Sequence, residues 1–163
     1  MDGTVGQQLE HDHHRIDEGF AQYAASLTSP AVDRAAFDGA ARALRHHIHV
    51  EETLHFPVLK AAGLLAPVLV MLREHGEIWD LLDASAVALD QGDATAAQNL
   101  WPRLAAVLEQ HNMKEERILY PAGDKTLSTA DADLVVTTLA TGETPSGWVC
   151  EMAGRSGSEA AAE

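Results

Sequence analysis

The chain has 163 residues, of which 25 are acidic and 11 are basic, and its formal net charge is −14. This length fits a single domain with a sizeable core. The acidic balance argues against a nucleic-acid partner, because phosphate binding requires a basic surface. No run of about 18 apolar residues is present, so the sequence predicts no segment that spans a membrane.

Cysteine usage and the N-terminus together favour a cytoplasmic protein. Cys150 is the only cysteine in the sequence. A single thiol excludes an internal disulfide and a zinc–thiolate cluster, and it suits a reducing compartment. The first residues lack the basic and apolar regions of a signal peptide.

Helical periodicity indicates two long helices in the first half of the chain. Thr4-x-x-Gln7 forms a capping box ahead of an apolar stripe that continues to about Leu27, and His13 lies on this stripe. The second helix is expected from about residue 30 or 33 to residue 62. Pro57 should kink or fray its last turns.

The second half repeats this arrangement. Pro67 can open a third helix that ends near Leu89, and Asp93 caps a fourth. Trp101-Pro102 should interrupt and bend the fourth helix near its start. Residues 128–140 are expected to form a short fifth helix.

The predicted fold class is therefore all-α. Residues 1–140 are expected to form an antiparallel up-down-up-down four-helix bundle with a short C-terminal fifth helix. Residues 141–163 are rich in Gly, Ser, Ala and Glu, a composition that predicts an extended or disordered, flexible tail.

A histidine followed four residues later by a pair of glutamates occurs twice, at His47 to Glu51 and at His111 to Glu115. Residues four apart share one face of a helix, so each pair can present a nitrogen and a carboxylate together. One such pair alone is usually a solvated helix surface. Two copies, each followed by an aromatic residue and a proline, indicate a metal site.

Counting helical rise from the predicted turns, at ~1.5 Å per residue, brings six side chains to one level of the bundle. Burying them without a metal would be costly, and nitrogen and oxygen donors without thiolate favour iron or manganese over structural zinc. The two halves repeat at 62–64 residues, which predicts two metal ions side by side. The six candidate ligands are His13, His47, Glu51, His75, His111 and Glu115.

The remaining histidines and the tyrosines receive other roles. His55 could line the mouth of the site or be solvated. A tyrosine could supply a phenolate, although core packing is the main role expected of both Tyr23 and Tyr120. Four histidines lie off the inward faces and are expected at the surface, namely His11, His14, His46 and His49.

These segments, in this order, resemble the hemerythrin-like, or HHE cation-binding, domain over about residues 5–122. The pattern that carries the resemblance is Leu9-x-x-Asp12-His13-x-x-Ile16, His47-x-x-x-Glu51-Glu52, Glu74-His75 and His111-x-x-x-Glu115-Glu116 with Pro121. The resemblance implies a non-heme di-iron centre with an oxo or hydroxo bridge. It assigns His13 and His47 to one iron, His75 and His111 to the other, and Glu51 and Glu115 as bridges.

Trp79 stands where oxygen-carrying hemerythrins have a further histidine, so the oxygen-carrier set is incomplete. We expect the Trp79 ring to wall an open position beside the iron held by His75. The implied function is binding of, or reaction with, O2, peroxide or NO as a small ligand. A catalase-like or ferroxidase enzyme and an iron store or sensor remain alternatives.

Overall fold

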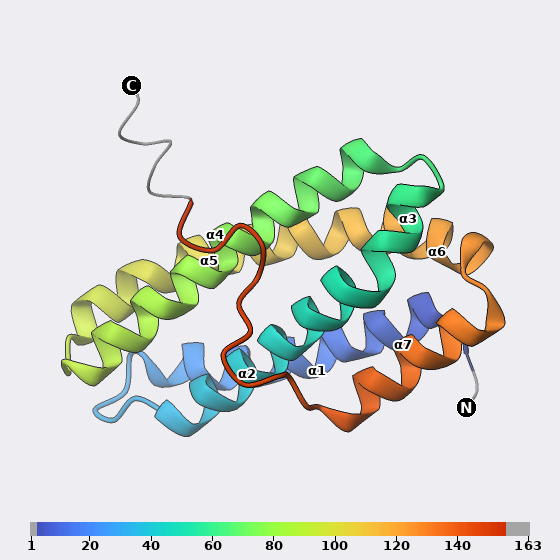
Figure 1. Ribbon diagram of the computed structural model, residues 1–163. Coiled ribbons are helices and arrows are strands. Elements are labelled where there is room, and N and C mark those ends of the chain that lie inside the picture. The colour runs from blue at the N-terminus through green and yellow to red at the C-terminus, as the bar shows by residue number, and fades with distance from the viewer. Residues whose placement is uncertain (1–2, 156–163) are drawn as a thin grey trace.

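The computed structural model of the protein describes residues 3–155, and every regular element within this range is a helix (Figure 1). The all-α class is therefore confirmed. Caps fix the predicted starts: Thr4 and Gln7 form the capping box, and the side chains of Asp33, Asp93 and Ser128 each accept a hydrogen bond from a backbone N–H in the first turn of the next helix. The elements in order are α1 (Val5–Ser26), α2 (Arg34–Val50), η1 (Glu51–His55), α3 (Phe56–Ala61), α4 (Leu65–Asp90), α5 (Ala94–Lys114), η2 (Glu115–Leu119), α6 (Tyr120–Thr126) and α7 (Thr129–Thr141).

The helices associate as two long hairpins. The most extensive contacts between elements join α1 to α2 and α4 to α5, while α6 returns against α1, and α7 packs on α1 and α2. Figure 1 shows α2, η1 and α3 as one continuous helical path, and α5, η2 and α6 as another. Among the described residues, no helix is both long and apolar enough to cross a membrane.

The core is divided into two apolar clusters with a polar layer between them. One cluster lies toward the loops that close the hairpins and contains Phe20, Phe37 and Leu82. The other lies toward α3, α6 and α7 and contains Leu9 and Leu59. All six candidate ligands lie at the junction of these clusters and are buried.

Neither of two prolines interrupts its helical path. The chain does not fray at Pro57: a five-residue π-helical turn, η1, precedes this proline, and α3 continues through it. Proline lacks an N–H and its ring crowds the carbonyl four residues earlier, so the wider turn accommodates it. Likewise α5 continues across Pro102. Pro102 is exposed, so water can reach the carbonyl that it leaves without an intrahelical partner.

Residues 142–155, which we call the C-terminal strap, correct the prediction of a disordered tail. They contain no helix, as an extended segment should. However, they cross α2 and α4 in contact with the bundle (Figure 1), and the Cys150 side chain is buried in the core cluster that contains Phe20. Burial of Cys150 with half-buried Trp148 and Met152 holds the strap in place. The part of the predicted tail from residue 156 lies outside the described residues.

Candidate metal centre

Glu51 lies between two histidines that come from different hairpins. Its Oε1 is 3.1 Å from Nε2 of His47, and its Oε2 is 3.2 Å from Nε2 of His75. The carboxylate is fully buried. Each of its two oxygens therefore faces a different imidazole.

Glu115 takes the corresponding position in the second half. Its Oε2 is 3.2 Å from Nε2 of His13, and its Oε1 is 3.0 Å from Nε2 of His111. The two carboxylates thus span the same gap, between a pair of imidazoles from α1 and α2 and a pair from α4 and α5. This arrangement brings all six predicted ligands together.

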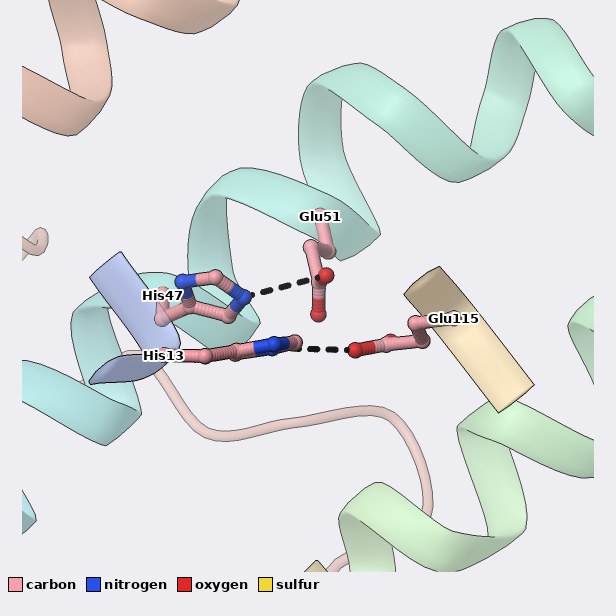
Figure 2. A group of neighbouring side chains, drawn as sticks. All are labelled: His13, His47, Glu51 and Glu115. Atoms are coloured by element: carbon pink, nitrogen blue, oxygen red, sulfur yellow. Dashed lines mark hydrogen bonds and ion pairs between the residues drawn. The ribbon is translucent and has the colours of Figure 1, made fainter. Parts of the chain in front are cut away.

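The six side chains form two donor sets, each with its donor atoms within 4.8 Å of one another. Figure 2 shows the first set, in which His47 and Glu51 project from one helical path and meet His13 and Glu115. The sets share both glutamates. They are His13, His47, Glu51 and Glu115, and Glu51, His75, His111 and Glu115.

Each of the four imidazoles also meets a second carboxylate through Nδ1. A carboxylate only accepts, so Nδ1 donates a proton to it, and Nε2 faces the centre as the atom that a metal would bind. We call these four acidic residues the outer carboxylates. The pairs are His13 with Glu116 at 2.9 Å, His47 with Asp12 at 2.8 Å, His75 with Glu52 at 2.7 Å and His111 with Glu74 at 3.2 Å.

Tyr120 belongs to the centre as well as to the core, which extends the packing role predicted for it. Its hydroxyl lies 2.8 Å from Oε1 of Glu51 and 3.1 Å from Oε2 of Glu115. It also lies 2.9 Å from Nε2 of His13 and 3.2 Å from Nε2 of His47. The hydroxyl has one proton to donate, so it can serve only one carboxylate at a time, while its oxygen can accept from a protonated imidazole.

The π-helical turn η2 explains why Tyr120 reaches the site. In an α-helix a residue five positions beyond Glu115 would be turned about 140° away. Here the N–H of Tyr120 donates to the carbonyl of Glu115, which places the two residues one turn apart on nearly the same face. The first half has the same turn with Phe56 in the equivalent place. The Phe56 ring stacks on His75, with centroids 5.4 Å apart.

His55 is buried, which corrects the solvated alternative. Because the π-helical turn gives the inward position to Phe56, His55 is rotated toward α6. Both of its ring nitrogens lack a hydrogen-bond partner, and a Cβ added at Gly123 would lie 2.4 Å from Nε2. Burial lowers the pKa of His55, although Glu51 and Glu115 act in the opposite direction.

Two of the four histidines assigned to the surface are covered instead. His11 and His14 are exposed, as predicted. His46 is buried under α7 and the strap, where its Nε2–H donates to the carbonyl of Thr138. His49 packs edge-on against Trp148. None of the four belongs to either donor set.

Trp79 contacts the C-terminal strap, and its expected role as the wall of an open metal position stays a prediction. Its ring meets the Trp148 ring, with centroids 5.6 Å apart, and the Arg45 guanidinium lies 5.0 Å above it. Both partners are only half-buried. The Trp79 ring therefore helps to seat the C-terminal strap.

Without metal, the buried imidazoles and carboxylates of the centre shift one another's pKa values. Burial alone would lower the pKa of His47, but Glu51 and Asp12 reverse the effect and raise it to about 10. The pKa values of His75 and His111 are raised for the same reason. Burial and mutual repulsion act to raise the pKa of Glu51, yet His47 and His75 hold it below its usual range. In the metal-free protein the raised pKa values of His47, His75 and His111 place a proton on Nε2 as well as on Nδ1, and a metal would displace the Nε2 proton.

The donor atoms fit a metal ion. Oε2 of Glu51, Nε2 of His75 and Oε1 of Glu115 are buried and make ion-pair contacts, but none of the three has a hydrogen-bond partner of suitable geometry. A buried polar atom without a partner costs roughly 1–3 kcal/mol. A cation bound among these atoms would satisfy all three. Imidazole and carboxylate donors suit iron, manganese or zinc, with geometry and availability deciding among them.

Fold and site together define an all-helical protein with two adjoining His/Glu donor sets. Residues 4–123 match the hemerythrin family, described as the hemerythrin HHE cation binding domain. Because the match covers most of the sequence, the chain belongs to this family. Neither the curated proteins nor the solved structures gave a match. Helix α7 and the C-terminal strap lie beyond the matched residues.

Proposed function

We propose that the protein holds a non-heme di-iron centre that binds or reacts with O2, peroxide or NO. The observation that supports this most directly is the sharing of Glu51 and Glu115 between the two donor sets. Each glutamate directs one oxygen to each pair of imidazoles. Under this proposal His13 and His47 hold one iron, His75 and His111 hold the other, and the two carboxylates bridge them.

Bound iron would supply Lewis acidity and redox chemistry at this centre. The protein's own residues make the two positions unequal. Tyr120 offers an oxygen beside His13 and His47, whereas Phe56 occupies the equivalent place beside His75 and offers none. The small ligand is therefore proposed to bind on the His75 and His111 side.

We also propose a topology for the helices, a cellular location and a type of ligand. The pairing of α1 with α2 and of α4 with α5 supports the antiparallel up-down-up-down bundle. The single cysteine supports a cytoplasmic location, and the charge of −14 supports a small-molecule ligand over nucleic acid.

Metal analysis of the anaerobically purified chain tests the centre, and two irons per chain are expected. Glu51→Ala and Glu115→Ala should each lose iron from both positions, because both sets lose a donor. His14→Ala, at an exposed position, is the matched control and should retain both. A chain with one iron, or a bridging variant with full iron and an unchanged visible spectrum, would contradict the proposal.

The same samples distinguish binding from turnover. Spectra recorded on adding O2, peroxide or NO identify the ligand. Oxygen release from excess peroxide would indicate a catalase-like enzyme, and ferrous oxidation beyond two irons per chain would indicate a ferroxidase or store. A stoichiometric, reversible spectral change would indicate a binding protein or sensor.

A further inference from the structure

The C-terminal strap is anchored at several points on α2 and α4. The Trp148 ring lies against His49, at a centroid distance of 4.7 Å, and against Trp79. Farther along, the N–H of Gly154 donates to Oδ1 of Asp80 at 2.7 Å. With Cys150 buried between these contacts, the strap follows a defined path.

The sequence of α4 provides a seat for the strap next to a candidate ligand. A Cβ added at Gly76 would lie 2.5 Å from the carbonyl oxygen of Met152. A real Cβ cannot approach backbone so closely, so the strap reaches this position only because residue 76 is glycine. Gly76 follows His75 directly.

One hydrogen bond connects the strap to the centre. The N–H of Glu151 donates to Oε1 of Glu52 at 2.9 Å, while Oε2 of Glu52 accepts from Nδ1 of His75 at 2.7 Å. The Glu52 side chain is 6% exposed. The strap thus fixes the carboxylate that orients His75.

Other outer carboxylates obtain their support differently. Arg15 binds Asp12 at 2.7 Å, and Lys114 binds Glu74. Both basic residues lie within the part of the chain that matches the family, residues 4–123. Glu52 instead receives a main-chain amide from a segment beyond the match. The support of His75 is therefore a feature added by the strap.

We propose that the C-terminal strap is a positioning element for the metal held by His75 and His111. By holding Glu52, it keeps Nε2 of His75 directed at that donor set and slows loss of that one metal. The inference rests on the proposed di-iron centre. Loss of such outer partners typically weakens metal binding 10–100-fold. His13 and His47 are oriented by other carboxylates, from α1 and η2, so their metal should not respond.

Gly76→Ala tests the proposal in the full-length chain, with Gly39→Ala as control because a Cβ there meets nothing within 4 Å. Hydrogen exchange should show faster exchange across residues 142–155 in Gly76→Ala only. Removal of iron by a chelator should then become biphasic, with one iron per chain released about tenfold faster or more and the other within about twofold of wild type. Trp148→Ala provides a second way to release the strap.

A double variant shows whether the effect passes through Glu52. Glu52→Gln alone should also speed release of one iron, and adding Gly76→Ala should change little further, because the two act in series. Rate effects that multiply would overturn the proposal, as would a freed strap with unchanged release. If the strap amides stay protected from exchange in both Gly76→Ala and Trp148→Ala, the contacts at Gly76 and Trp148 do not hold the strap in place, and the proposal fails. A wild-type chain with fewer than two irons would instead refute the proposed function.

Discussion

The hydroxyl of Tyr120 contacts two carboxylates and two imidazoles at the centre, and its counterpart Phe56 has no such group. Burial, together with Glu115 and Glu51, raises the pKa of Tyr120 well above its usual range when no metal is present. A metal at the His13 and His47 set would favour the phenolate instead, since a cation reverses the local electrostatics.

Tyr120→Phe is expected to leave the helices intact, because phenylalanine already fills the equivalent place at position 56. The iron-loaded variant should lose any visible phenolate-to-iron absorption band. The metal-free variant should be less stable by roughly 1–3 kcal/mol, because the carboxylates lose the hydroxyl donor that they share. Absorption spectra and urea unfolding measure the two effects. Tyr23→Phe is the matched control, since the Tyr23 hydroxyl is buried without a hydrogen-bond partner; an equal spectral loss there would exclude Tyr120 as the source.

The sequence predicted which six side chains lie together at the centre, but not the residues that support them. A repeat of four residues is enough to place His47 with Glu51 on one helical face. The motif did contain a signal for the outer carboxylates, because Asp12 and Glu52 directly adjoin candidate ligands in the sequence. Asp12 and Glu52 each accept a hydrogen bond from a histidine on another element. Helix periodicity describes one helix at a time, so it does not predict these partners.

The two π-helical turns η1 and η2 are the elements that shape the centre. Each begins at a glutamate that both donor sets share and ends just before an aromatic residue and a proline. π-Helical turns often occur at functional sites. The α-helical stretches were predictable from caps and periodicity, but the extra residue in each turn rotates the next part of the helix by about 100°. This rotation placed Phe56, rather than His55, against His75, and it brought Tyr120 inward.

Gly123→Ala tests how η1 packs against α6. The new Cβ would lie 2.4 Å from Nε2 of His55, and His55 is fully buried with little room to move. Overpacking of this kind typically destabilises by about 1–3 kcal/mol. Thermal and urea unfolding should show this loss. Gly39→Ala should instead be stabilised slightly, by about 0.5–1 kcal/mol, because alanine favours the helix. Equal behaviour of the two variants would show that His55 is not confined by α6.

For the molecule as a whole, the pairing of the long helices could be predicted from the sequence, but the packing of helix α7 and the C-terminal strap over them could not. Alternating apolar stripes and short links predicted two hairpins, and α1 with α2 and α4 with α5 form them. His46 and His49 looked exposed because their faces point away from the centre. Helix α7 and the strap cover those faces. A segment rich in glycine and serine gives no local signal of such a position, because a few large side chains, Trp148 above all, hold it there.

The buried charged layer between two apolar clusters should make stability depend on pH in opposite ways with and without metal. In the metal-free protein the pKa of His47 rises from 6.5 to about 10, so its contribution is complete below pH 6.5 and is lost as pH rises toward 10. The pKa values of Glu51 and Glu115 are lowered from 4.5, so their contribution is complete above pH 4.5 and is lost as pH falls below it. The metal-free protein should therefore be most stable between about pH 4.5 and 6.5.

With metal bound, the stability of the protein should no longer fall as pH rises above about 6.5. A metal needs the Nε2 lone pairs that protons occupy in the metal-free cluster, so its stabilising effect should grow as pH rises from about 6 to 9. Melting temperatures of loaded and chelator-treated protein, measured across this range, should diverge, with each 1 kcal/mol corresponding to about 2–4 °C. His47→Gln removes one of the protons concerned and should flatten part of the alkaline decline of the metal-free protein. A metal-free melting temperature that is the same at about pH 6 and pH 9 would show that the imidazoles are not held protonated by the carboxylates. A gap between the two forms that narrows with pH would show that the metal does not bind at their Nε2 atoms.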